Sequence, residues 1–96
     1  RLLLDDGKAG AEQVVSADWM RRMRTPCAIA PFYGYLVWLN HNRSIFPSIS
    51  ESSFFAIGAG SSFTWIEPEN RMVVVVRWID AAYADAFFKR VFAVLK

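Results

Sequence analysis

The sequence predicts an α+β domain, an antiparallel meander of strands with helices packed on one face. Three observations support this class. A turn-forming segment, Glu67–Asn70, separates two apolar runs, and the last sixteen residues carry an apolar stripe with helical spacing. Apolar residues make up 54% of the 96 residues, enough for one small core. We therefore expect a single domain over residues 1–96.

The N-terminal third is predicted to hold two helical segments. Residues 1–7 have the pattern of the last turns of a helix, with Gly7 as its cap, and residues 8–15 are predicted to form a loop. Ser16 can cap a second helix, which Pro26 would end. The apolar face of that helix would consist of Trp19, Met20 and Met23.

Four runs rich in aromatic and β-branched residues are predicted as strands. They are residues 32–39, 54–60, 62–67 and 71–79. The last two are joined by the tightest turn signal of the chain, in which Pro68 presets its own φ and Asn70 tolerates the left-handed conformation. A polar loop over residues 40–53 would connect the first strand to the meander.

A helix over residues 81–95 is predicted to end the chain, with Asp80 as its cap. Its apolar stripe is Ala84, Phe87, Phe88, Val91 and Leu95. Asp85 and Lys89 are spaced to form an ion pair on the opposite side.

Composition and charge exclude several classes of function. The net charge is +2, and the one basic cluster, Arg21, Arg22 and Arg24, lies where a helix would end, so no nucleic-acid partner is expected. No apolar run approaches the roughly 18 residues of a membrane span. The only cysteine, Cys27, has no disulfide partner, and His41 has no carboxylates at metal-binding spacing. No metal and no cofactor are therefore expected.

The most unusual stretch is the run of small residues Gly58–Ser62 between two apolar strand sequences. Ser61 and Ser62 have no lysine or histidine near them in sequence and no Gly-x-Ser-x-Gly motif around them, so neither is expected to be a nucleophile. Such a run can form a bulge or bend, which composition alone favours. It can also let another molecule approach the backbone, whose N–H groups would then bind a ligand or an oxyanion.

The order of segments from residue 54 onward resembles a known family. "AIG" at Ala56–Gly58 precedes "AGSS", "FTWI", a proline-containing turn, "RMVVVVRW" and a final helix. Upstream, "RLLLDDG", "SADW" and "FYGYLVWLN" also fit. This order is similar to the C-terminal region of the serine β-lactamase and penicillin-binding protein superfamily, in particular its class C-like hydrolases and esterases. A partial β-lactamase/transpeptidase-like fold is therefore implied over nearly the whole chain.

The resemblance implies a substrate-facing strand formed by Ala56, Ile57, Gly58, Ala59 and Gly60. The N–H of Ala59 would supply one half of an oxyanion hole. The Ser-x-x-Lys nucleophile motif and the Tyr-x-Asn or Tyr-x-Ser element of the family are absent from these residues, so no catalytic residue is expected in this chain. The family's Lys-Thr-Gly or His-Thr-Gly triplet is replaced here by Ala56-Ile57-Gly58.

The resulting expectation is the C-terminal portion of a longer serine hydrolase of esterase, amidase or β-lactam hydrolase type, inactive alone. The alternative is a non-catalytic binding or assembly domain with the same fold. The implied partners are a small ester or amide substrate, the N-terminal part of the same protein, and further copies of the chain that pair along the 71–79 edge. The compartment stays open between periplasm and cytoplasm of a bacterial cell.

Overall fold

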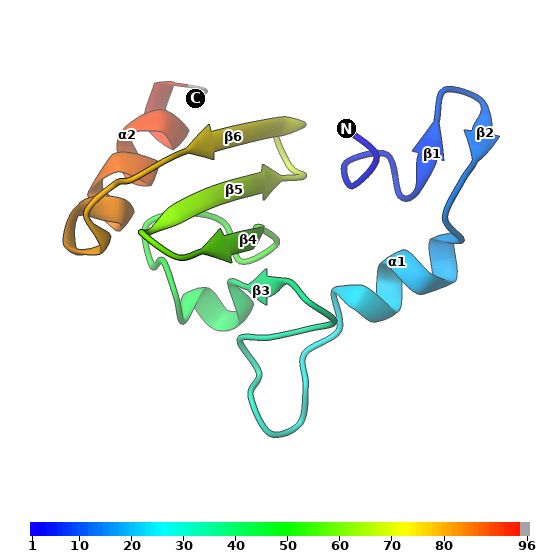
Figure 1. The fold of residues 1–96 in the computed structure, drawn as a ribbon, viewed down its shortest axis with the longest axis horizontal. Helices are drawn as coiled ribbons and strands as arrows, with labels where there is room; N and C mark the ends of the chain where they lie inside the picture. The colour runs from blue at the N-terminus through cyan, green and yellow to red at the C-terminus, as the bar shows by residue number, and fades with distance from the viewer. Residues whose placement is uncertain (95–96) are drawn as a thin grey trace.

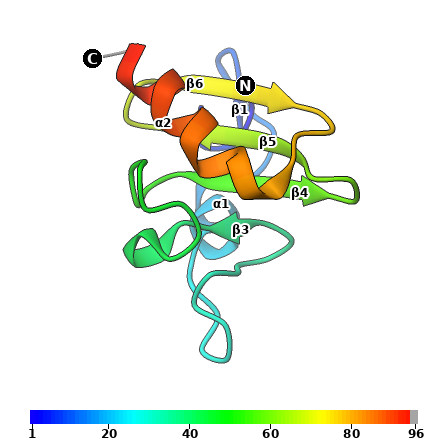
Figure 2. The same ribbon diagram turned by 90° about the vertical axis from the view of Figure 1, so that its left-hand side faces the viewer.

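The chain forms an antiparallel four-stranded sheet with a helix across one face (Figures 1 and 2). The computed structural model describes residues 1–94. The strand order is β3-β4-β5-β6, and the predicted α+β class is confirmed. The sheet consists of β3 (Trp38–Leu39), β4 (Phe54–Gly58), β5 (Ser62–Glu67) and β6 (Met72–Val76). The other elements are β1 (Lys8–Ala9), β2 (Glu12–Gln13), α1 (Ala17–Met23), α2 (Ala84–Val94) and the short 3-10 turns His41–Arg43 and Ala81–Tyr83.

The main core lies between the sheet and α2. Phe88 of the helix is fully buried and its ring contacts several aromatic rings of the sheet and the preceding loop. Those rings are Phe46, Phe55, Phe63 and Trp65, with centroid distances of 5.0 to 5.7 Å. Because successive strand residues alternate between faces, one face of each strand supplies this cluster. The packing of these rings thus holds α2 against one face of the sheet.

A second, smaller cluster covers part of the opposite face. It contains Val37, Leu39, Phe54 and Ile66, with Leu3, Leu4 and Met23 of the N-terminal third packed against it. The prediction that the helices pack on one face of the sheet is therefore wrong. The helix α2 lies on one face, and Met23 of α1 packs against the other.

The N-terminal segment differs from the predicted helix end. Residues 1–7 form a single turn, in which the Asp5 N–H bonds to the Arg1 carbonyl. Asp6, at φ 52°, and Gly7, at φ 88°, close this turn. The predicted loop over 8–15 contains the small hairpin β1–β2. The Ser16 cap is confirmed, since its hydroxyl accepts a hydrogen bond from the Trp19 N–H at 3.1 Å.

The predicted strand over residues 32–39 is wrong in most of its length, since only Trp38–Leu39 is a strand. The segment folds back on itself, with Tyr33 bridged to Trp38 and Leu36 at φ 63°. The cause is Gly34, which lies so close to the Met23 carbonyl of α1 that a Cβ would overlap it. This contact turns the chain where β propensity alone favours extension.

The turn between β5 and β6 forms where the sequence predicts it, but the left-handed residue is Arg71, at φ 52°, and not Asn70. Asn70 instead donates from its backbone and its side chain to one carboxylate oxygen of Glu67, at 2.6 and 2.9 Å. Glu67 is fully buried and also accepts a hydrogen bond from the Ser50 hydroxyl at 2.7 Å. The carboxylate therefore ties this turn to the loop before β4.

The final helix begins later than predicted. Asp80 caps a 3-10 turn through the Ala82 N–H, and α2 follows over Ala84–Val94. Leu95, the last residue of the expected stripe, lies outside the described residues. Phe87 is 37% exposed, so the buried stripe is narrower than expected. The Asp85 carboxylate accepts hydrogen bonds from the backbone and hydroxyl of Ser48, where the sequence suggested Lys89 as its partner.

Candidate functional site

The five residues of the predicted substrate-facing strand lie at one end of β4. Ala56, Ile57 and Gly58 are the last three residues of that strand, and Ala59 and Gly60 form the turn to β5. On its other side β4 pairs with β3 only at Phe54 and Phe55. Beyond Phe55, no strand of residues 1–94 borders that side of β4. The backbone of this end is therefore open at one edge.

Alternation along the strand identifies the groups that face this open edge. The Ser53 carbonyl accepts a hydrogen bond from the Asn40 N–H on the β3 side, at 3.1 Å. In an antiparallel ladder the N–H and C=O of every second residue point to the same neighbour. The N–H and C=O of Ile57 therefore face the open edge, one donor and one acceptor that an extended ligand can pair with.

A shallow groove of about 350 Å³ lies beside these residues. It is lined by Ala56, Ile57, Gly58, Ser62, Phe63, Thr64, Val75, Val76 and Arg77. The outward residues of this set, Ala56, Thr64 and Val75, are direct neighbours across β4, β5 and β6. They alternate with the residues that contact α2, so the groove opens on the face away from the helix. The N-terminal segment covers the other end of that face and leaves this end free.

Gly60 is required by the fold of this chain. It has φ 77°, a conformation that L side chains rarely adopt, and a Cβ there would overlap the ring of Trp78. The bend in the small-residue run is thus real, and it is located at residues 59–61, where Ser61 also has a positive φ of 56°.

The fold does not explain why residue 58 is a glycine. Its φ lies outside the left-handed region, and a Cβ built on it would meet nothing within 4 Å. The other four glycines have either a positive φ or a backbone neighbour that excludes a Cβ. Gly58 is therefore the one glycine that this fold does not need, and it borders both the groove and the open edge of β4.

We expect the two glycines to respond differently to substitution. Gly58→Ala should leave the free energy of unfolding within about 0.5 kcal/mol of the wild type, because an exposed strand position with free space accepts a methyl group. Gly60→Ala should lower it by about 1–3 kcal/mol through backbone strain and overlap with Trp78. Urea unfolding followed by tryptophan fluorescence measures both. Equal losses at the two positions would show that Gly58 is also structural.

The polar groups of the groove come from β5 and the end of β6. They are the hydroxyls of Ser62 and Thr64 and the guanidinium of Arg77. No lysine, histidine or carboxylate lines the groove within the described part of the chain. Within this lining Ser62 has no side chain beside it that could act as a general base. Sequence reasoning missed Thr64 and Arg77, although counting outward from the Glu67–Asn70 turn places Thr64 opposite Val75.

The isolated candidate residues form no second centre. His41 and Glu51 line a separate cavity of about 360 Å³ together with Arg21 and Arg24. Arg24 is paired there with Asp6 at 2.8 Å, and Arg21 with Asp18. Among residues 1–94, no group of three metal-ligating side chains comes together.

Cys27 is exposed, and hydrogen bonds from the backbone N–H groups of Ile29 and Ala30 lower the pKa of its thiol. These amides stabilise the thiolate only while the loop is folded. We therefore expect the rate of alkylation by iodoacetamide to rise with pH at a lower midpoint in the folded chain than in the chain unfolded by urea. The measurement is the pH profile of the pseudo-first-order rate in each state. Coincident profiles would contradict the proposed role of the two amides.

Comparison with known protein families, curated proteins and solved structures finds no match to the chain. None of the helices in the described residues is long and apolar enough to cross a membrane. The functional assignment accordingly depends on the residues and geometry of the groove and the β4 edge.

Proposed function

We propose that the chain is the C-terminal portion of a β-lactamase-related serine hydrolase of esterase, amidase or β-lactam hydrolase type. In this role the end of β4 is the substrate-facing strand, and the groove beside it takes the acyl part of the substrate. The proposal rests on the presence of a glycine at residue 58, beside the unpaired end of β4. Gly58 is exposed and unneeded for the fold, and it adjoins a backbone edge that has a free donor and acceptor. A missing side chain at that point lets a ligand reach the main chain.

The chemistry assigned to this part is binding and electrostatic stabilisation. The Ile57 N–H and C=O would pair with the substrate backbone, and the Ala59 N–H would donate to the oxyanion that forms during acyl transfer. Ala59 is the first residue of the turn after β4, next to Gly58. The nucleophile and its base would come from an N-terminal part of the same protein. The described residues supply no base to the groove, so this chain alone should not form an acyl-enzyme.

A fluorophosphonate probe, which labels activated serines covalently, tests this division of labour. We expect labelling of a longer protein that carries this chain, at a serine of a Ser-x-x-Lys sequence upstream of Arg1. We expect no labelling of residues 1–96 alone. Labelling at Ser61 or Ser62 of the short chain would contradict the proposal, and so would an upstream sequence without a Ser-x-x-Lys motif.

A non-catalytic binding or assembly domain is the second candidate. The observation that favours it is the side chains at the triplet position, where Ala56 and Ile57 carry neither charge nor hydroxyl. Such a domain would bind ligand through the β4 edge without turnover. Binding of a short-chain ester by the longer protein, with no hydrolysis and no labelling by the probe, would select this alternative.

A further inference from the structure

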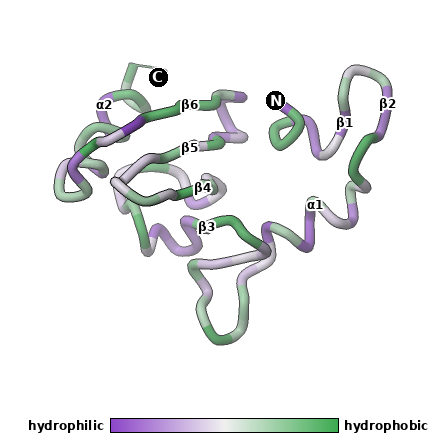
Figure 3. Tube along the Cα trace, viewed as in Figure 1, coloured by the Kyte–Doolittle hydropathy of each residue, from purple (hydrophilic) through white to green (hydrophobic). Residues whose placement is uncertain are grey.

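Trp78 has a backbone conformation that is rare for a bulky residue. It lies just after β6, a strand that is hydrophobic over its length (Figure 3). Its φ is 61°, in the left-handed region, which costs free energy for any residue that has a Cβ. The side chain is 72% exposed, so burial in the core does not offset this cost. Strain of this kind persists where the surrounding structure imposes it, and it is concentrated at functional sites.

The indole ring of Trp78 lies against the turn between β4 and β5. A Cβ built on Gly60 would come within 1.9 Å of this ring, so the ring contacts the main chain of that glycine. The next residue, Ile79, donates from its N–H to the Ser61 carbonyl at 3.3 Å. The chain that leaves β6 toward α2 therefore passes beside this turn and contacts two of its residues (Figures 1 and 2).

The turn has few other contacts that could hold it. It consists of residues 59–61, of which Gly60 and Ser61 have φ values of 77° and 56°. The bond from Ile79 is the only hydrogen bond that these three residues make within residues 1–94. Ala59 and Gly60 are exposed, so packing in the core does not fix them. The ring of Trp78 and the Ile79 N–H are thus the contacts that hold this turn in place.

The N–H of Ala59 depends directly on the shape of this turn. It donates to no acceptor within residues 1–94. The ladder with β5 fixes the chain before it, up to the pair of Gly58 and Ser62. The contacts of Trp78 and Ile79 fix the chain after it. An amide that stabilises an oxyanion must already have its orientation when the charge forms, because reorganisation at that moment would raise the barrier.

We propose that Trp78 is a positioning residue for the oxyanion donor. Its ring holds Gly60, and it thereby keeps the N–H of Ala59 in one orientation before the substrate binds. This inference rests on the proposed hydrolase function, in which the Ala59 N–H donates to the oxyanion. The role accounts for an exposed indole that is kept in a strained backbone conformation, against a glycine that the turn requires.

The hydrolysis of a short-chain p-nitrophenyl ester, by a longer protein that carries this chain, tests the proposal. Trp78→Gly removes the ring but accepts the left-handed backbone. It should lower kcat at least about tenfold and leave KM within about twofold, since the oxyanion forms only in the transition state. Trp78→Phe, which keeps an aromatic ring at this position, should retain kcat within about threefold of the wild type. Tyr83→Ala is the matched control and should not change kcat, because Tyr83 is another aromatic residue that is 67% exposed.

The outcomes separate the role of Trp78 from the proposed function. Melting temperatures verify that each variant folds. A wild type that hydrolyses no ester contradicts the proposed function, and with it the catalytic role of Trp78. Hydrolysis by the wild type with an unchanged kcat in Trp78→Gly overturns the role of Trp78 alone. A rise in KM at unchanged kcat would likewise overturn it, because the side chain would then act on substrate binding.

Amide order parameters, measured by NMR in residues 1–96, test the positioning without any reaction. Ala59 and Gly60 should be as rigid as the strands in the wild type, with S² of about 0.85, and should fall below about 0.6 in Trp78→Gly. Tyr83→Ala should leave both values unchanged. A turn that is equally ordered in the wild type and in Trp78→Gly overturns the positioning by Trp78, whether or not the longer protein is a hydrolase.

Discussion

Replacing Asn40 by alanine is expected to lower the free energy of unfolding by about 3–5 kcal/mol. Asn40 is fully buried at the start of the loop between β3 and β4. Its side-chain NH₂ donates to the carbonyls of Phe46 and Ser50, both at 2.9 Å, and its carbonyl oxygen accepts from the Phe46 N–H at 2.8 Å. Alanine would remove all of these hydrogen bonds and leave the Phe46 N–H buried without a partner, which costs more than that hydrogen bond itself contributes. The Phe46 and Ser50 carbonyls would keep only the N–H groups of Ile49 and Ser53, at 3.4 and 3.2 Å.

The measurement is urea unfolding of Asn40→Ala beside His41→Ala, a substitution at the adjacent exposed residue. The His41 variant should stay within about 0.5 kcal/mol of the wild type. Asn40→Asp should be at least as damaging as alanine, because a carboxylate cannot donate to the two carbonyls. A loss below about 1 kcal/mol at Asn40 would mean that the loop is not held by this side chain.

The second large effect is expected at Phe88. Its truncation to alanine should cost about 3–5 kcal/mol, because the ring is fully buried and fills the centre of the aromatic cluster between α2 and the sheet. Phe87→Ala is the matched control, since Phe87 is the same residue type in the same helix but is 37% exposed.

Thermal or urea unfolding of the two variants gives the comparison. We expect the loss at Phe88 to exceed that at Phe87 by at least about 1.5 kcal/mol. Similar losses at both positions would contradict the orientation of α2 on the sheet.

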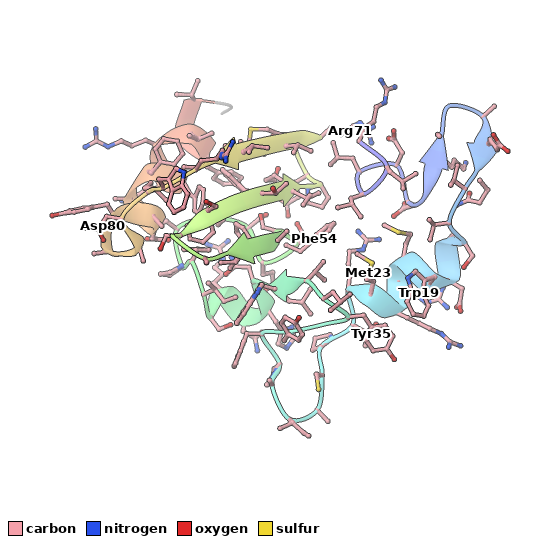
Figure 4. The ribbon with its side chains drawn as sticks, in the orientation of Figure 1. Trp19, Met23, Tyr35, Phe54, Arg71 and Asp80 are labelled. Carbon is pink, nitrogen blue, oxygen red and sulfur yellow. The ribbon has the colours of Figure 1, made fainter. Side chains whose placement is uncertain are left out.

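The parts of the fold that depend on local chemistry were predictable from sequence. The Ser16 and Asp80 caps, the β5 strand and the hairpin around Pro68 are each specified by residues within a few positions of one another. The wrong predictions arose from contacts between distant segments. Gly34 turns the chain because of its contact with Met23. The ring of Trp19 packs at a tilt against the ring of Tyr35 in that turned segment, with centroids 5.4 Å apart (Figure 4).

The irregular backbone at the candidate site could be predicted from the sequence, but its structural detail could not. The small-residue run correctly indicated an irregular end of β4, and the structure separates its two causes. Gly60 is needed for the turn and for Trp78, a contact that no local pattern reveals, whereas Gly58 is not needed by this chain. The open β4 edge depends on how short β3 is, and that follows from the unforeseen turn at Gly34.

The kcat/KM for a short-chain p-nitrophenyl ester, measured in a longer protein that carries this chain, tests the central claim most directly. Wild type and Gly58→Val are compared, with melting temperatures to confirm folding. The account predicts hydrolysis by the wild type and a loss of about 100-fold or more in Gly58→Val at nearly unchanged stability, because the added side chain would keep the substrate from the β4 backbone and the oxyanion donor. Hydrolysis that is unaffected by Gly58→Val would contradict it.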